Sequence, residues 1–96
     1  MSLRSRHVLE MVLDEVESAQ SKFPPFNSGH EGYAVILEEL DELWDEIRAG
    51  KGLKQSAVAG AEAVQVAAMA IRFVLDLCEQ DDVRAFRDGK RRPAVP

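Results

Sequence analysis

Apolar residues along the chain recur at the three- and four-residue spacing of an amphipathic helix, and no segment shows the alternation of a half-buried strand. The first stretch shows this spacing most plainly, with Val8, Leu9, Val12, Leu13 and Val16. This stretch predicts a helix from Leu3 to Lys22. We expect it to end before Phe23-Pro24-Pro25, because a residue that precedes proline is pushed out of the α region.

Two further helices follow from the same pattern. The second runs roughly from Glu31 to Ala49 and ends at Gly50-Lys51-Gly52, where glycine is a usual stop signal. Its apolar side chains fill an arc of about 120°, made by Tyr33, Ile36, Leu37, Leu40, Leu43, Trp44 and Ile47. The third begins near Lys54 and continues to about Glu79, which would make it roughly 39 Å long.

The third predicted helix is apolar on nearly every side and rich in alanine. A helix of this kind must be buried all round, and two other helices of the same chain cannot cover it. We therefore expect an all-α bundle of three main helices, completed by dimerisation into a core like that of a four-helix bundle. A homodimer or a dimer of dimers would satisfy this expectation.

A short fourth helix and a tail complete the chain. Asp81-Asp82 is expected to cap a helix from Val83 to Asp88, and Gly89 to close it. The remaining residues, 90–96, read KRRPAVP and predict a basic, flexible tail. Residues 1–89 are thus expected to form one helical domain.

Composition narrows the class of protein. A formal net charge of −5 over 96 residues argues against stable nucleic-acid binding, which needs a basic surface. The chain has one cysteine, Cys78, so no intrachain disulfide forms. This fits a reducing compartment, and we interpret the thiol as a buried structural one.

The longest apolar stretch carries Glu62, Gln65, Arg72 and Asp76, which make it too polar to span a membrane comfortably. We expect a soluble, cytoplasmic protein that binds no membrane.

The segment FPPFNSGH, residues 23–30, has the composition of a loop but carries two phenylalanines. One interpretation is that Phe23 and Phe26 close the end of the bundle. The other is that one of them, together with His30, lines a pocket for a flat ligand such as a nucleobase. The sequence leaves both open.

Residues 38–46 hold six carboxylates on the second predicted helix. Like charges four residues apart on a helix repel one another, as Glu38 and Glu42 or Glu42 and Glu46 would. No lysine lies on this helix to neutralise them. Either water solvates an acidic face, or a cation binds there.

Glu62 favours the cation. It lies in an apolar region and begins a polar stripe at helical spacing that includes Gln65, Met69, Arg72 and Asp76. The short connection after Gly50 favours antiparallel packing of the two helices, which would set this stripe beside the acidic flank. Oxygen ligands from facing helices would suit Mg²⁺ or Mn²⁺.

The run EELDELWDEI, followed after a short linker by an alanine-rich helix with an acid, resembles the MazG-type all-α nucleoside triphosphate pyrophosphatases. Their pattern is ExxE, a spacer of one to two dozen residues, then ExxD. Glu39 and Glu42 match the first pair, and Glu38 stands in the usual additional position before them. After a spacer of 19 residues, Glu62 matches the first acid of the second pair. The resemblance covers residues 31–77.

The resemblance implies hydrolysis of a nucleoside triphosphate, ribo or deoxy, to the monophosphate and pyrophosphate with Mg²⁺ or Mn²⁺. It implies that Glu38, Glu39, Glu42 and Glu62 bind the metal, with Gln65 and Glu46 as weaker ligands. Glu38 or Glu39 would orient or deprotonate the attacking water. The candidate substrate contacts are Lys51, Lys54 and Arg72 for phosphate, with Phe26 and His30 for the base. Each of the three basic residues has an alternative interpretation as a surface or capping charge.

One position departs from the family pattern. The second pair reads Glu62-Ala63-Val64-Gln65, so a glutamine stands where the family has aspartate. A glutamine can offer a neutral carbonyl oxygen to a metal, but the site loses one negative charge. Two alternatives to an active enzyme therefore remain: a metal- or nucleotide-binding relative without turnover, and a helical oligomerisation or adaptor module.

Overall fold

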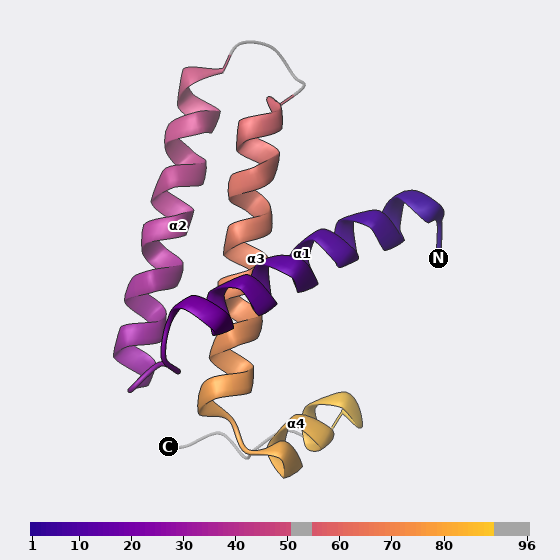
Figure 1. Cartoon of the computed structure of the whole chain (residues 1–96), viewed down its shortest axis with the longest axis vertical. Coiled ribbons are helices and arrows are strands. Elements are labelled where there is room, and N and C mark those ends of the chain that lie inside the picture. The colour runs from indigo at the N-terminus through magenta and orange to yellow at the C-terminus, as the bar shows by residue number, and fades with distance from the viewer. Residues whose placement is uncertain (51–54, 90–96) are drawn as a thin grey trace.

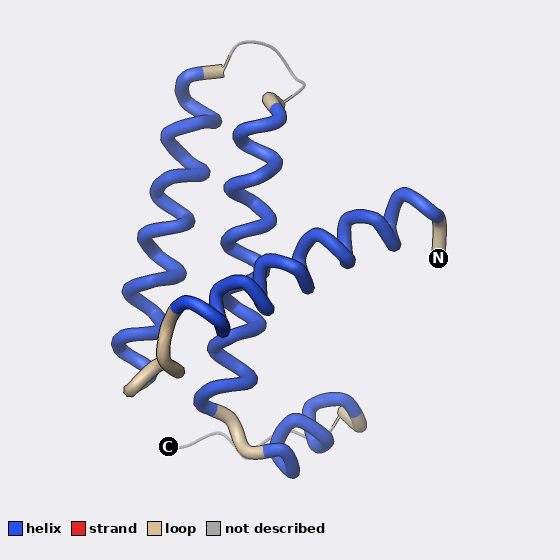
Figure 2. Tube along the Cα trace, viewed as in Figure 1, coloured by secondary structure: helices blue, strands red, loops and turns tan. Residues whose placement is uncertain are grey.

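The computed structural model describes residues 1–50 and 55–89, which form four helices and no strand (Figure 2). The helices are α1 (Leu3–Lys22), α2 (Gly29–Ala49), α3 (Ala57–Leu77) and α4 (Gln80–Arg87). The expectation of an all-α protein with three main helices and a short fourth is confirmed. Completion of the bundle by a second copy stays a prediction.

Serine side chains begin each of the three long helices. The hydroxyl oxygens of Ser2, Ser28 and Ser56 each accept a hydrogen bond from a backbone N–H three residues further on. Such caps satisfy one of the free donors of a helix start. They explain why α2 begins at Gly29 rather than Glu31, and why α3 begins at Ala57. Lys54, the expected start of the third helix, lies outside the described residues.

The predicted cap of α4 is wrong. Glu79 is the N-cap residue and makes no side-chain capping bond, whereas Asp81 and Asp82 lie within the first turn. Carboxylates in that turn still favour the helix, because its N-terminus carries partial positive charge. Gly89 closes the segment as expected: its φ is +78°, and its N–H donates to the Phe86 carbonyl. The predicted tail, 90–96, lies outside the described residues.

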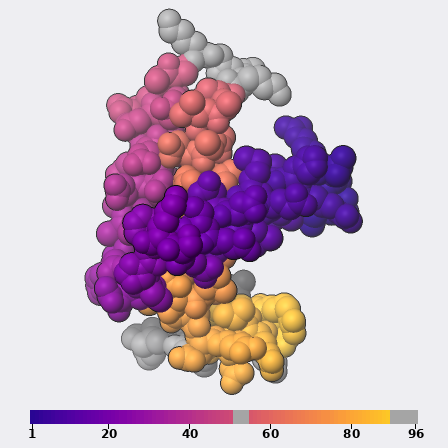
Figure 3. All heavy atoms as spheres, in the orientation of Figure 1, coloured from indigo at the N-terminus to yellow at the C-terminus, as the bar shows by residue number. Residues whose placement is uncertain are grey.

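α3 is the central helix of the fold. α1 and α2 both pack against it, and Figure 1 shows α2 alongside α3 while α1 crosses it. The core between them is small and built from Val12, Val16, Ala19, Ala68 and Met69. The N-terminal half of α1 projects beyond this core, as the space-filling view shows (Figure 3). Two sides of α3 are thus covered within one chain.

The apolar arc of α2 does not face α3 as a whole. Ile36 and Leu43 are half-buried, whereas Tyr33, Leu40 and Trp44 are exposed. The buried residue of α2 is Gly32. A Cβ atom placed there would lie 2.6 Å from Cδ2 of Phe73, so only glycine allows this approach.

α3 is long and apolar enough to cross a membrane by length and composition. The core helix of a soluble protein, which is mostly buried, passes the same test; in α3, 22% of the apolar window is buried within this chain. Cys78, expected to be buried, is half-buried just after this helix. Solubility and a cytoplasmic location stay predictions.

Candidate metal site and adjoining pocket

Three glutamates from two helices meet beside one another. Each of Glu39, Glu42 and Glu62 offers a carboxylate oxygen, and these three oxygens lie within 4.8 Å of one another. Glu39 and Glu42 are separated by almost one turn of α2, and Glu62 lies in the second turn of α3. Antiparallel packing of α2 on α3 brings them together, as the sequence predicted.

The electrostatics of this three-glutamate cluster are unfavourable when all its members are ionised. Partial burial and the charge of Glu42 raise the pKa of Glu39 above its ordinary value of 4.5, with smaller contributions from Glu62 and Glu38. Desolvation and Glu42 likewise raise the pKa of Glu62, with a further contribution from Glu46. Both shifts have the direction expected for crowded carboxylates. A cation bound among these oxygens would instead lower the pKa values of both glutamates.

A pocket of about 540 Å³ adjoins this cluster and shares Glu39 with it. The walls come from α1, the 23–28 loop, α2 and α3. The acidic lining residues are Glu15, Glu31, Glu38 and Glu39, and the loop contributes Phe23, Pro24 and Phe26. Lys22 and Arg72 bring the only positive charges among the described lining residues. The pocket therefore combines flat apolar surface with hydrogen-bond acceptors.

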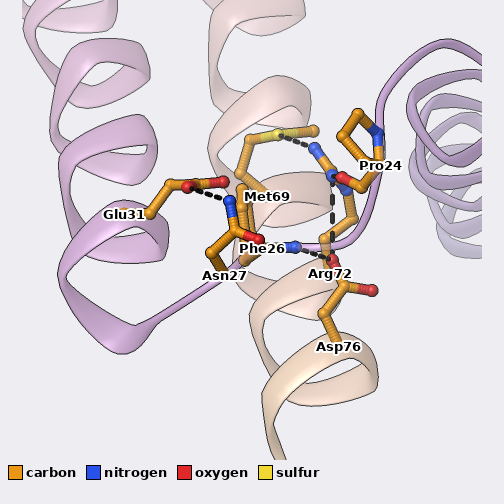
Figure 4. Close-up of polar contacts among 7 residues, drawn as sticks. All are labelled: Pro24, Phe26, Asn27, Glu31, Met69, Arg72 and Asp76. Carbon is orange, nitrogen blue, oxygen red and sulfur yellow. Dashed lines mark hydrogen bonds and ion pairs between the residues drawn. The ribbon is translucent and has the colours of Figure 1, made fainter.

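Buried polar contacts hold the loop against α3. The backbone N–H of Phe26 donates to Oδ2 of Asp76 at 3.0 Å, and Nη2 of Arg72 donates to the Pro24 carbonyl at 3.1 Å. The Arg72 and Asp76 side chains are 4% and 8% exposed, and 3.7 Å separates Nη2 from Oδ2. Figure 4 shows how these residues converge. The loop is thus anchored by an ion pair between two residues that lie one turn apart on α3.

Arg72 is also one of the residues that line the pocket. Its Cζ lies 4.3 Å from the centre of the Phe26 ring, a cation–π distance. Nη1 lies 3.7 Å from the Met69 sulfur, while Nε has no hydrogen-bond partner among the described residues. Arg72 is therefore buried, and the interpretation of it as a surface charge is wrong.

The other expected site residues fall into three groups. Glu38 and Gln65 line the pocket but do not belong to the three-glutamate cluster, and Glu46 contributes only through its charge. Phe26 is buried and lines the pocket, whereas His30 is exposed in the first turn of α2 and is not among the lining residues. Lys51 and Lys54 lie outside the described residues.

Sequence reasoning missed Glu15, Lys22 and Glu31 as lining residues of the pocket. Nothing in the periodicity of α1 marks Glu15, because one of many acids on an amphipathic helix carries no special signal. Its position depends on the angle at which α1 crosses α3, which only the folded chain shows. Lys22 and Glu31 lie on either side of the loop in the sequence, and this position was the one signal that could have identified them as lining residues.

Comparison of the chain with protein-family models, with curated proteins and with solved structures gives no match. The resemblance to MazG-type pyrophosphatases therefore stays a prediction, which rests on Glu38, Glu39, Glu42 and Glu62.

Proposed function

We propose that the protein is a Mg²⁺-dependent nucleoside triphosphate pyrophosphohydrolase. The observation that carries the proposal is the convergence of Glu62 of α3 with Glu39 and Glu42 of α2. The second support is the pocket beside them, whose volume lies in the range of small-molecule sites, about 300–1,000 Å³.

The donor set of the three-glutamate cluster suits a hard divalent cation. Each of the three glutamates offers a carboxylate oxygen, the ligand type that Mg²⁺ binds in proteins, and these oxygens lie within 4.8 Å of one another. A bound Mg²⁺ would neutralise phosphate oxygens and polarise the phosphorus that is attacked.

The remaining roles follow from position. Glu38 lines the pocket without belonging to the three-glutamate cluster, so it is free to orient or deprotonate the attacking water, and Glu39 serves the metal. Phe23, exposed on the loop, and the Phe26 ring supply flat apolar surface for a base. Lys22 is the exposed cation of the lining and would meet phosphate.

The experiment that tests this function measures pyrophosphate release from a panel of ribo- and deoxynucleoside triphosphates with Mg²⁺. We expect turnover by the wild type and its loss in Glu62→Gln, which keeps the side-chain shape and removes one charge. Glu10→Gln is the matched control and should retain turnover, because Glu10 is an exposed acid of α1 that lies far from Glu62 in the sequence. Activity of Glu62→Gln equal to that of the control would refute the role of the cluster.

Binding without turnover is the second candidate, and Gln65 favours it. Its amide lines the pocket where the resembled family has a carboxylate, so the site has one negative charge fewer. Titration calorimetry with Mg²⁺ or Mn²⁺ separates the candidates: heat without pyrophosphate release supports the binding protein. We expect Gln65→Asp to raise metal affinity or turnover. No change in either would remove Gln65 from the metal site.

A further inference from the structure

The pocket beside the three-glutamate cluster offers a ligand more hydrogen-bond acceptors than free donors. Its described lining holds four carboxylates and two cations, Lys22 and Arg72. Arg72 is 3% exposed, and its Nη2 already donates to the Pro24 carbonyl at 3.1 Å. Ser18 and Gln65, the neutral polar residues of the lining, can donate or accept. Because the guanidinium is buried against its own chain, carboxylates are the commonest polar groups that a ligand would meet.

The four carboxylates of the lining are not equivalent. Glu39 belongs to the three-glutamate cluster, and Glu38 is the residue assigned to the attacking water. Oε2 of Glu31 already accepts from Nδ2 of Asn27 at 3.0 Å. Glu15 is half-buried and has no hydrogen bond or ion pair within the part of the chain that the structure describes. It also lies on α1, which contributes no residue to the cluster, so its acceptors are available to a ligand.

Phe23 supplies most of the free aromatic surface of the pocket. It is 59% exposed, whereas Phe26 is 6% exposed and has Cζ of Arg72 4.3 Å from the centre of its ring. A flat heterocycle could therefore stack on Phe23. If its edge carried N–H donors, the same ligand would also satisfy Glu15.

We propose that this pocket selects nucleobases with an amino group in place of a keto oxygen, and that Glu15 is the specificity-determining residue. The inference rests on the proposed function, since it names the substrates of the same site. Uracil and hypoxanthine have a keto oxygen where cytosine and adenine have the amino group. An ionised carboxylate only accepts hydrogen bonds, so it attracts the amino N–H and repels the keto oxygen.

The expected selectivity follows from the charge and the partial burial of Glu15. Hydrogen bonds to a charged group contribute more than neutral ones, which corresponds to a preference of about 10- to 100-fold. Fully enclosed polar sites reject the wrong partner by factors on the order of 10⁴ or more. Glu15 should fall short of that factor, because a half-buried carboxylate keeps some contact with water.

The test compares kcat/KM for pyrophosphate release within two matched pairs, dCTP with dUTP and dATP with dITP, in the presence of Mg²⁺. We expect the wild type to prefer dCTP and dATP by about 10-fold or more. Glu15→Gln should bring both ratios to within about threefold of unity, because an amide both donates and accepts. Glu17→Gln is the matched control: Glu17 is an exposed acid of the same helix and is not among the lining residues.

The outcomes separate this inference from the proposed function. A wild type that releases pyrophosphate equally from both members of a pair, or prefers dUTP, would overturn the selectivity and leave the function standing. A ratio in Glu15→Gln equal to that of Glu17→Gln, with helix content unchanged by circular dichroism, would remove Glu15 from the role.

Calorimetric titration with dCMP and dUMP decides the matter where no turnover is found, since both carry the base and neither can release pyrophosphate. Tighter binding of dCMP, by about 10-fold or more, would then uphold the selectivity while the proposed function fails. Absence of turnover together with equal or undetectable binding of the two monophosphates would overturn both.

Discussion

The ion pair between Arg72 and Asp76 should be the most stabilising charged interaction of the described chain, although it is not the shortest. At an effective dielectric constant of 20, opposite charges 3.7 Å apart attract by about 4.5 kcal/mol. Removing one partner of a buried pair typically costs about 3–5 kcal/mol, because the other charge stays buried without compensation. We therefore expect Asp76→Asn to lower the free energy of unfolding by about 3 kcal/mol. The asparagine can still accept from the Phe26 N–H.

Asp45→Asn provides the matched control. Asp45 pairs with Arg48 at 2.6 Å, but the two side chains are 64% and 60% exposed. Because water screens this pair, its loss should cost at most about 1 kcal/mol. Burial, not distance, would then decide the difference between the two variants.

The assay is urea denaturation followed by circular dichroism, at one protein concentration because dimerisation would couple to folding. A loss of 3 kcal/mol corresponds to a melting temperature lower by about 15 °C for a domain of this size. Equal losses for Asp76→Asn and Asp45→Asn would refute the reasoning. Because Asp76 anchors the loop that carries Phe23 and Phe26, ligand affinity of the pocket should fall in the first variant alone.

Two further predictions concern packing and pH. Gly32→Ala should destabilise the protein by about 1–2 kcal/mol despite the better helix propensity of alanine, because its Cβ would lie 2.6 Å from Phe73. Gly60→Ala, whose added Cβ would meet nothing within 4 Å, should be neutral or stabilising in the same urea denaturation. The raised pKa values of Glu39 and Glu62 mean that the folded state binds more protons than the unfolded state just above pH 4.5. Metal-free stability should therefore fall as pH rises through those values, and Mg²⁺ should restore it; a stability that rises with pH there and ignores Mg²⁺ would contradict the cluster.

Local sequence determined the helices and most of the acidic site. Helical spacing and the Phe23-Pro24-Pro25 break give α1 its observed bounds, because both act within a few residues. The nearness of Glu62 to Glu39 and Glu42 was also predictable, since a short connection between two helices forces them antiparallel. The start of α2 was missed by two residues because Ser28 was not recognised as a cap.

Only the tertiary structure decided which faces are covered. Periodicity showed the apolar arc of α2, but it could not show that Tyr33 and Trp44 point outward while Gly32 meets Phe73. It also could not show that Arg72 and Asp76 are buried beneath the 23–28 loop. Helix periodicity depends on neighbours in sequence, whereas burial depends on the angle and height at which helices cross. Those quantities are set by the summed packing of distant side chains, so they exist only in the folded chain.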